Sequence, residues 1–330
     1  MIISRTPLRM SFVGGGTDLP AFYRRSGGAV VSTAINQFVY ITVNKKFDEK
    51  IRVSYSRTEE ARSVDRIRHP LVREAMRLLG IAGGVEITSI ADIPARGTGL
   101  GSSSAFTVGL LHALHAYAGR PATAEELARQ ACEIEIDRCG EPIGKQDQYA
   151  AAFGGLNFIR FNPDDTVRVE AIRCAEATWR LMEERMLVFY TGITRRASTI
   201  LKEQQAAVRR KRQQEVLRRM TELACALRRE LEADQVGNLG AMIHEGWLLK
   251  RGVAEGITND QIDRWYEQAR RAGAEGGKLL GAGKGGFLLF IAPRDRHEAI
   301  GRALAPLRRM DFRFEWRGSQ TIFVYHSGKY

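Results

Sequence analysis

The sequence lacks any apolar stretch close to the roughly 20 residues that a helix needs to cross a bilayer. Its first residues, MIISRTPLRMSF, also lack the apolar core and the small-residue cleavage site of a secretion signal. These two absences argue against a membrane-spanning helix and a secreted precursor. They predict a soluble protein of the cytoplasm with no membrane partner.

Cysteine is scarce, with four residues in a chain of 330 and neither a CxxC pair nor a metal-ligand spacing among them. We therefore expect free thiols in a reducing compartment rather than disulfides or a zinc site. These cysteines are Cys132, Cys139, Cys174 and Cys225. Repeats and low-complexity segments are absent too. The length and the 44% hydrophobic content predict about two ordinary globular domains.

Positive charge is in excess, with a net charge of +12 that makes anionic partners plausible. Much of the excess lies in Arg209–Arg229, where five apolar residues recur at helical spacing: Val216, Leu217, Met220, Leu223 and Leu227. One face of that helix should pack and the basic remainder should be solvated. One possible function for such a chain is that of a basic protein that binds nucleic acid and is not an enzyme. Without interleaved aromatic residues or a known DNA-binding motif, we expect no nucleic-acid partner.

Strand-like and helical segments alternate along the chain, which predicts an α+β fold. Strands are expected at Ala29–Val43 (with a bend near Asn36), Val85–Ile90, Leu156–Phe161, Val167–Ile172, Met186–Tyr190, Phe287–Ile291 and Thr321–Tyr325. Helices are expected at Ala105–Tyr117, Thr123–Cys139, Ala197–Glu232, Leu239–Arg251, Asn259–Ala272 and Arg296–Leu307. Thr123 with Glu126, and Thr258 with Gln261, fit capping boxes. The pattern changes near residue 180, so we predict two domains, 1–180 and 181–330.

The most informative stretch is the glycine-serine loop Pro94–Ala105, PARGTGLGSSSA. Its glycines can adopt positive φ, and a helix follows at once, so free amide N–H groups point into the loop. Such a nest suits phosphate oxygens, and serine hydroxyls can add bonds or reach a metal. An ordinary serine N-cap would need only one glycine and one serine. The predicted phosphate-binding residues are Gly97, Gly99, Leu100, Gly101, Ser102, Ser103 and Ser104.

Two better-known nucleotide patterns fail here. Gly140–Gln146, GEPIGKQ, is one residue short of a P-loop and lacks the final serine or threonine. Gly281–Gly286, GAGKGG, fits GxGxxG but precedes a predicted strand, whereas a dinucleotide fingerprint follows one. Neither pattern therefore predicts a nucleotide site by itself.

Three separated segments resemble the motifs of the GHMP kinases, in the order found in that family. They are Pro7–Asp18 (PLRMSFVGGGTD), the glycine-serine loop, and Lys278–Phe287 (KLLGAGKGGF). The resemblance implies a ribosomal-protein-like N-terminal ATP-binding domain and a ferredoxin-like C-terminal domain. It also implies that ATP, Mg²⁺ and a small substrate meet at their interface.

Departures from the family pattern narrow the range of possible substrates. Galactokinases carry an acidic residue and a histidine where this chain has Gly15 and Gly16, which argues against galactose. Lys284 stands where the third motif usually has a small residue, and it either approaches phosphate or faces solvent, with solvent favoured. The segments GGGTDLP, GEPIGKQDQYAAAFGGLNF and FYTGITRRAS look like those of the family's kinases of D-glycero-D-manno-heptose 7-phosphate.

That likeness implies phosphorylation of the anomeric oxygen to give the 1,7-bisphosphate, a step toward GDP-heptose and surface glycans. A kinase of an unphosphorylated hexose, fucose-like or mannose-like, remains the alternative because the core motifs would be the same. Which anomer reacts, which residues contact adenine, and whether the chain forms a homo-oligomer are left open by the sequence.

Catalytic and metal roles carry over from the family to single positions. Asp147 matches the catalytic aspartate, which accepts the sugar hydroxyl's proton. Arg9 matches a basic residue that either stabilises charge on the transferring phosphoryl group or holds Asp147. Glu135, twelve positions before Asp147, matches the magnesium-binding glutamate, with Ser103 as its partner. Glu133 is the rival for that role.

The substrate side is expected in the first motif, where Asp18 matches the family's sugar-binding aspartate and lies beside Gly15, Gly16 and Thr17. A carboxylate accepts two hydroxyl hydrogens and suits a vicinal diol, although capping of the following turn is the ordinary alternative. A sugar phosphate also needs a second anion site. The candidates for it are Arg195, Arg196 and Lys145.

Overall fold

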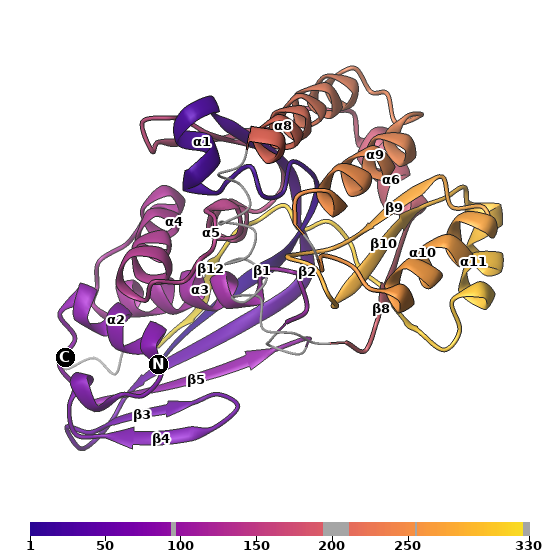
Figure 1. Cartoon of the computed structure of the whole chain (residues 1–330). Helices are drawn as coiled ribbons and strands as arrows, with labels where there is room; N and C mark the ends of the chain where they lie inside the picture. The colour runs from indigo at the N-terminus through magenta and orange to yellow at the C-terminus, as the bar shows by residue number, and fades with distance from the viewer. Residues whose placement is uncertain (94–96, 194–210, 255, 326–330) are drawn as a thin grey trace.

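Two β-sheets, one of eight strands and one of four, organise the residues that the computed structural model describes: 1–93, 97–193, 211–254 and 256–325. Helices cover both sheets, and the two sheets stand side by side (Figure 1). The arrangement is the α+β fold that the sequence predicts.

The larger sheet is built on β1 (Ile2–Val13) and β2 (Gly28–Lys45), which pair antiparallel. Its strand order is β12-β1-β2-β5-β3-β4, and β6 and then β7 branch from β2. The remaining strands are β3 (Ile51–Ser54), β4 (Thr58–Ala61), β5 (Val85–Ala91), β6 (Leu156–Phe161), β7 (Val167–Ala171) and β12 (Gln320–Val324). The bend predicted near Asn36 is confirmed. Pro7 pairs with Phe38 but Leu8 with Ile35, so two residues bulge from β2.

Helix α3 (Ser102–Tyr117) lies on β1 and β2 and positions the glycine-serine loop. It approaches the sheet closely at Gly109, where a Cβ atom would lie 2.7 Å from the Thr6 hydroxyl oxygen. Its neighbours are α2 (Pro70–Leu79), α4 (Ala124–Cys132) and α5 (Gln146–Phe153), on the same face of the sheet (Figure 1). Helix α1 (Pro20–Ser26) follows the first motif, and 3₁₀ turns occupy Val64–Arg66 and Arg294–Arg296.

The helix predicted over Thr123–Cys139 is confirmed at its start and differs at its end. The capping box is present, with the Thr123 hydroxyl accepting from the Glu126 amide at 3.2 Å. After Cys132 the backbone winds into a π-helix over Glu133–Arg138. Such wide turns are common at functional sites because they redirect side chains. Here Glu133 lies at the surface while Glu135 is buried.

The smaller sheet contains β8 (Met186–Tyr190), β9 (Gly276–Leu279), β10 (Phe287–Ile291) and β11 (Arg308–Met310), all antiparallel in the order β11-β8-β10-β9. Numbered along the chain, this is the 4-1-3-2 order of a ferredoxin-like unit. Its helices are α6 (Glu176–Arg185), α8 (Lys211–Glu232), α9 (Leu239–Arg251), α10 (Asp260–Arg271) and α11 (His297–Ala303). Helix α9 contacts both β9 and β1, so it joins the two sheets.

Helix α8 agrees with its predicted pattern over the residues that the structure describes. Leu217, Met220, Leu223 and Leu227 are buried. Three arginines on the other face are paired with carboxylates: Arg218 with Glu215 and Glu222, Arg219 with Glu222 and Glu245, and Arg228 with Glu170 and Glu232. Ion pairs therefore neutralise part of the basic face.

The cap of α10 was predicted wrongly. Asn259, not Thr258, caps the helix, because its side-chain oxygen accepts from the amides of Gln261 at 3.1 Å and Ile262 at 3.0 Å. Asn259 has the extended backbone that an N-cap needs. The Thr258 hydroxyl instead donates to the Asp263 carboxylate at 2.8 Å.

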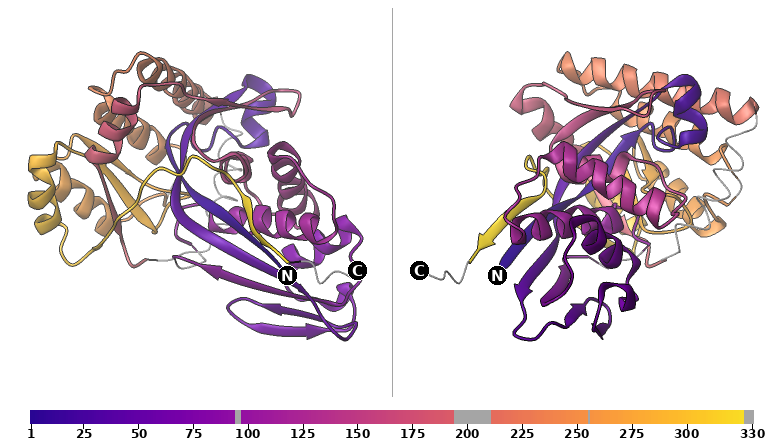
Figure 2. Two further views of the ribbon diagram at one scale, coloured as in Figure 1. Left: turned by 180° about the vertical axis from the view of Figure 1, so that it is seen from behind. Right: turned by 90° about the vertical axis from the view of Figure 1, so that its left-hand side faces the viewer.

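The last strand crosses back to the first sheet. β12 pairs with β1, which gives β1 a hydrogen-bonded neighbour on each side. Leu19 and Phe22 make the reverse crossing, since they pack in the core of the smaller unit. Figure 2 shows β12 lying along β1 from two further sides. The division into two domains at residue 180 stays a proposal. Strand β12 belongs by its number to the predicted second domain, but it pairs in the larger sheet.

None of the helices in the described segments combines the length and the apolarity that a bilayer crossing requires. All four cysteines are free thiols, as predicted.

Candidate functional site

An arginine-carboxylate fork joins the first motif to α5. Arg9 donates from Nε to Oδ1 of Asp147 and from Nη2 to Oδ2, both at 2.8 Å. Its Nη1 donates to the Gly99 carbonyl at 2.7 Å. Arg9 is 4% exposed, and the Asp147 side chain is 25% exposed. The partner of Arg9 is therefore Asp147 and not a residue of its own strand, and a bidentate pair fixes the orientation of the carboxylate.

The glycine-serine loop ends beside this fork. Gly101 is the N-cap of α3 with φ 76°, and no side chain caps the helix. The first amides of α3, at Ser102–Ser104, thus have no side-chain cap, and the ordinary serine-cap explanation is wrong. A Cβ atom on Gly101 would lie 3.4 Å from Oδ2 of Asp147. The chain could therefore bring phosphate oxygens at the helix N-terminus close to this carboxylate.

Ser103 and Glu135 face each other, with the serine hydroxyl donating to Oε1 at 3.3 Å. Glu135 is 1% exposed and its Oε2 accepts from the Gln148 amide at 2.5 Å. Burial, aided by the charge of Asp147, raises the pKa of Glu135 to about 7. The rival Glu133 is turned away and pairs with Arg138 at 2.6 Å.

This donor set suits Mg²⁺. One hydroxyl and one carboxylate are hard oxygen ligands, and Mg²⁺ commonly takes one or two protein oxygens while phosphates and water complete its coordination. The described residues contain no cluster of three or more histidine, cysteine, aspartate or glutamate side chains, which is what an all-protein cage would need. Ser103 and Glu135 are thus the residues that would hold the ion.

Asp18 is buried next to the same turn. Its carboxylate accepts from the amides of Gly16 and Gln146, both at 3.1 Å. Burial, and then the charge of Asp147, raise the pKa of Asp18. Gly144 permits this approach, because a Cβ atom there would lie 1.9 Å from Oδ2 of Asp18. Asp18 is therefore held against the residue that precedes Asp147, so the two carboxylates lie close together.

Gln146 is a site residue that the sequence did not single out. Its amide nitrogen lies 3.4 Å from Oδ1 of Asp18, and its oxygen is buried with no hydrogen-bond partner in the described part of the chain. A Cβ atom on Gly15 would lie 3.9 Å from that oxygen. A buried acceptor left unpaired is costly, and a ligand hydroxyl would satisfy it. Only the fold reveals this, since a glutamine at the start of a helix carries no distinctive sequence signal.

Thr17 serves the fold. It is fully buried, and its hydroxyl donates to the Ala29 carbonyl at 3.0 Å and accepts from the Ala29 amide at 3.1 Å. Gly16, with φ 105°, turns the chain toward α8. We therefore leave Thr17 out of the residues proposed below to contact substrate.

Of the three candidates for a second anion site, Lys145 lies within the described residues. Lys145 donates to the Asp165 carbonyl at 3.0 Å and lies over the Tyr23 ring, 5.1 Å from its centroid. Asp165 also binds Arg24, so one carboxylate serves two cations there. Arg195 and Arg196 lie outside the described residues.

The third motif packs directly on the glycine-serine loop. A Cβ atom on Gly281 would lie 2.3 Å from the Cα of Gly99, and one on Gly286 would lie 2.3 Å from the Thr98 carbonyl oxygen. Lys284 has φ 60°, and the end of its side chain lies against Gly256, a packing that neither interpretation of this lysine included. The glycines of this motif are thus explained by close backbone contact.

Two buried lysines reach from the smaller unit toward the site and were missed by the sequence. Lys250 of α9 is 8% exposed, and its Nζ donates to the Gly281 carbonyl at 2.5 Å. Lys278 of β9 donates to the carbonyls of Ser11 at 2.8 Å and Phe12 at 3.0 Å. Burial lowers the pKa of both, that of Lys250 to about 8. In the sequence, Lys250 looks like an ordinary cation in the last turn of a helix.

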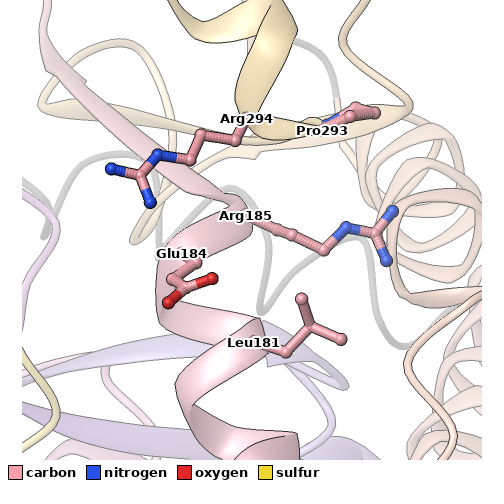
Figure 3. A pocket seen from close by; sticks show the side chains of 5 residues that line it. All are labelled: Leu181, Glu184, Arg185, Pro293 and Arg294. Atoms are coloured by element: carbon pink, nitrogen blue, oxygen red, sulfur yellow. The ribbon is translucent and has the colours of Figure 1, made fainter.

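A separate hollow of about 320 Å³ lies between α6 and the turn before α11. It is lined by Leu181, Glu184, Arg185, Pro293 and Arg294 and shares no residue with the fork. Figure 3 shows the guanidinium groups of Arg185 and Arg294 pointing apart. Arg185 is already bound to the Val236 carbonyl and to Glu275. The lining therefore offers no convergent set of polar groups.

Comparison with known proteins shows the family to which the chain is similar. A family model described as the GHMP kinases N terminal domain matches residues 68–155, and one described as GHMP kinases C terminal matches residues 227–307. The D-glycero-alpha-D-manno-heptose 7-phosphate kinase of Campylobacter jejuni is 30% identical over 91% of this chain and 92% of its own length. The bifunctional fucokinase/GDP-fucose pyrophosphorylase of Arabidopsis thaliana is 27% identical over 87% of this chain and 29% of its own length.

A solved structure gives the same picture in three dimensions. The crystal structure of a D-glycero-D-manno-heptose 1-phosphate kinase from Bacteroides thetaiotaomicron aligns with a TM-score of 0.81 and 26% identity. The alignment covers 99% of this chain and 100% of that one. The likeness thus extends over both sheets.

Proposed function

The chain belongs to the GHMP kinase family, and from that premise we propose that it phosphorylates the anomeric hydroxyl of D-glycero-D-manno-heptose 7-phosphate. Its family and relatives make it an ATP-dependent sugar kinase of the heptose kind. The proposed product is the 1,7-bisphosphate, which would enter the synthesis of GDP-heptose and surface glycans. The single observation that carries the chemistry is the Arg9–Asp147 fork beside the uncapped start of α3.

ATP would be held by Gly97, Gly99, Leu100, Gly101 and Ser102–Ser104. The uncapped amides at the start of α3 and the positive end of its dipole favour phosphate oxygens. Mg²⁺, held through Ser103 and Glu135, would neutralise charge on the phosphates. Positioning and charge neutralisation are most of what phosphoryl transfer requires from a protein.

Asp147 would accept the proton of the attacking hydroxyl. The hydroxyl oxygen forms a bond to the γ-phosphorus, the bond from that phosphorus to the β,γ-bridging oxygen breaks, and ADP leaves. Arg9 orients Asp147 through two hydrogen bonds, and it also links the carboxylate to the loop through Gly99. General-base help of this kind contributes about 10²–10⁴-fold to a rate.

The sugar would lie between Asp147 and Asp18. Asp18 and the unpaired Gln146 oxygen supply acceptors for ring hydroxyls, and Gly15 and Gly16 leave room beside them. The distal phosphate would bind Arg195 and Arg196. Lys145 is a weaker choice for it, because Asp165 already engages that ammonium group.

A kinase of an unphosphorylated hexose is the second candidate, supported by the likeness to a fucokinase. A panel of heptoses and hexoses with and without a terminal phosphate, assayed for ADP release with ATP and Mg²⁺, separates the two. We expect kcat/KM for heptose 7-phosphate to exceed that of every unphosphorylated sugar by at least about tenfold, since charge-assisted bonds to phosphate are strong. A hexose that matches or exceeds it would replace the heptose proposal.

Substitution of Arg195 or Arg196 by Gln then tests the distal site. The KM for the phosphorylated sugar should rise far more than the KM for ATP. Equal rises in both would show that these arginines do not bind the distal phosphate. Arg24→Gln, which removes a half-exposed cation paired with Asp165, is the control for general loss of positive charge.

A further inference from the structure

Lys250 reaches the point where the two glycine-rich loops meet. Its Nζ donates to the Gly281 carbonyl, and Gly281 lies directly against Gly99. The Gly99 carbonyl accepts from Arg9, which in turn holds Asp147. A continuous set of contacts thus connects the ammonium group of α9 to the transfer site.

The hydrogen bonds of Lys250 are incomplete. An ammonium group has three N–H donors, and the contacts of Lys250 with described residues account for one of them, that to Gly281. The residue is only 8% exposed, so bulk water reaches it poorly. Leaving charged donors buried without acceptors is costly. Lys278 provides the contrast, because two carbonyl oxygens of β1 receive its protons.

The surrounding charges point to an anionic ligand. Arg9 of β1 and Lys278 of β9 repel the ammonium group, and Asp18 and Asp147 attract it. Both carboxylates are engaged elsewhere, Asp147 by the guanidinium of Arg9 and Asp18 by two backbone amides. The unused donors of Lys250 therefore lie near the site, and no carboxylate in the described segments is hydrogen-bonded to them.

We propose that Lys250 is a further ligand-binding residue, whose ammonium group binds a non-bridging oxygen of the γ-phosphoryl group during its transfer. The proposal rests on the proposed kinase function. The hydrogen bond of Lys250 to Gly281, which packs against Gly99, puts it at the glycine-serine loop proposed to hold the phosphates. A preorganised cation there stabilises negative charge on the transferring group.

Nucleotide binding without sugar is the first test. With Mg²⁺ present, Lys250→Met should weaken binding of a non-hydrolysable ATP analogue by at least about tenfold and change ADP binding by no more than about twofold, measured by calorimetry. Arg251→Gln is the control. It removes the next charge on α9, which is paired with Asp263, and should leave both affinities unchanged.

Turnover gives an independent readout. Lys250→Met should lower kcat about 100-fold with little change in the KM for the sugar, and Lys250→Arg should restore part of the loss. The pKa of Lys250 is lowered to about 8, so the protonated, active form is present below that pH and is lost as the pH rises through it. The kcat/KM for ATP reports the free enzyme's groups, so its alkaline decline should be present in the natural protein and absent in Lys250→Met.

Two results would overturn this role. One is an equal loss of ADP and analogue affinity together with a lower melting temperature, which would make Lys250 a structural link to Gly281. The other is an increase confined to the KM for the sugar. Lys250→Gln keeps one donor for the Gly281 carbonyl and serves if the methionine variant does not fold. If the unsubstituted protein binds neither nucleotide, the proposed function itself fails.

Discussion

Two glycine-rich loops meet in this protein, and they use glycine for different reasons. The loop around Gly97–Gly101 follows β5 and leads into α3, where the helix amides are left without a side-chain cap. The loop Gly281–Gly286 joins two strands and leads into no helix. Its Gly281 and Gly286 lie against Gly99 and Thr98 of the first loop, too close for a Cβ atom.

This contrast teaches that a glycine pattern gains meaning only from the elements beside it. A loop that ends at a helix N-terminus can bind an anion, because the amides and the dipole are available there. In the second loop the amides of Lys284 and Gly286 already bind the carbonyls of Ile257 and Ile193, so its glycines serve packing. We therefore expect changes around the first loop to affect chemistry and changes in the second to affect stability.

Asp147→Asn should produce the largest effect on the chemistry that the first loop serves. The amide keeps an acceptor for Arg9 but cannot take up the hydroxyl proton, so kcat should fall by about 10²–10⁴-fold while ATP affinity is kept. Steady-state kinetics and calorimetry measure the two quantities. Asp65→Asn, which alters an exposed pair with Arg77, is the control. An undiminished kcat would remove Asp147 from the proposed mechanism.

Gly281→Ala tests the second loop. Its Cβ atom would lie 2.3 Å from Gly99 Cα, and φ is 79°, so the free energy of unfolding should fall by about 2–4 kcal/mol. Gly119→Ala is a matched control, since φ there is 67° but nothing lies within 4 Å, and about 1 kcal/mol is expected. Chemical denaturation measures both. Similar losses of unfolding free energy in the two variants would show that contact between the two loops does not contribute to stability.

Glu135→Gln should mainly raise the Mg²⁺ requirement, by about tenfold, because one charged oxygen ligand is lost beside the first loop. Titration of kcat against Mg²⁺ at saturating ATP measures this. Glu133→Gln is the control two residues away, where the carboxylate pairs with Arg138. If Glu133→Gln shifts the metal dependence and Glu135→Gln does not, the assignment of the ligand is reversed.

The smallest effect on stability is expected at the N-cap of α10, just after the segment that contacts the second loop. Ile257 accepts from the Lys284 amide at 2.8 Å, and α10 begins just beyond it. Asn259→Ala should lower the free energy of unfolding by about 1 kcal/mol, as loss of an N-cap does. Thr258→Ala should cost less, because its hydroxyl bonds only a side chain. A larger loss of unfolding free energy for Thr258→Ala than for Asn259→Ala would favour the predicted capping box at Thr258.

Much of the fold followed from local patterns. The apolar spacing of α8, the Thr123 capping box and the bend of β2 near Asn36 are all present. The π-helix at Glu133–Arg138 and the Asn259 cap were not predicted. The Asn259 cap is a local contact that was predicted one residue too early, and the local pattern did not mark the π-helix.

The site divides in the same way. The glycine-serine loop and the candidates Arg9, Asp18 and Asp147 could be named because each lies in a contiguous segment that resembles a family motif. Gln146, Lys250 and Lys278 could not, since a lone glutamine or lysine has no distinctive pattern. Their meaning comes from the Asp18 carboxylate, the Gly281 carbonyl and two carbonyls of β1.

The sequence by itself determined the family, and it predicted a phosphate-binding loop and the residue types for transfer, because these lie in short contiguous motifs. Tertiary structure alone decided that Arg9 binds Asp147 across 138 positions, that β12 returns to β1 across more than 300, and that one glycine loop supports another. The physical reason is that hydrogen bonds, charge pairing and close packing act over a few ångströms in space, regardless of the separation along the chain.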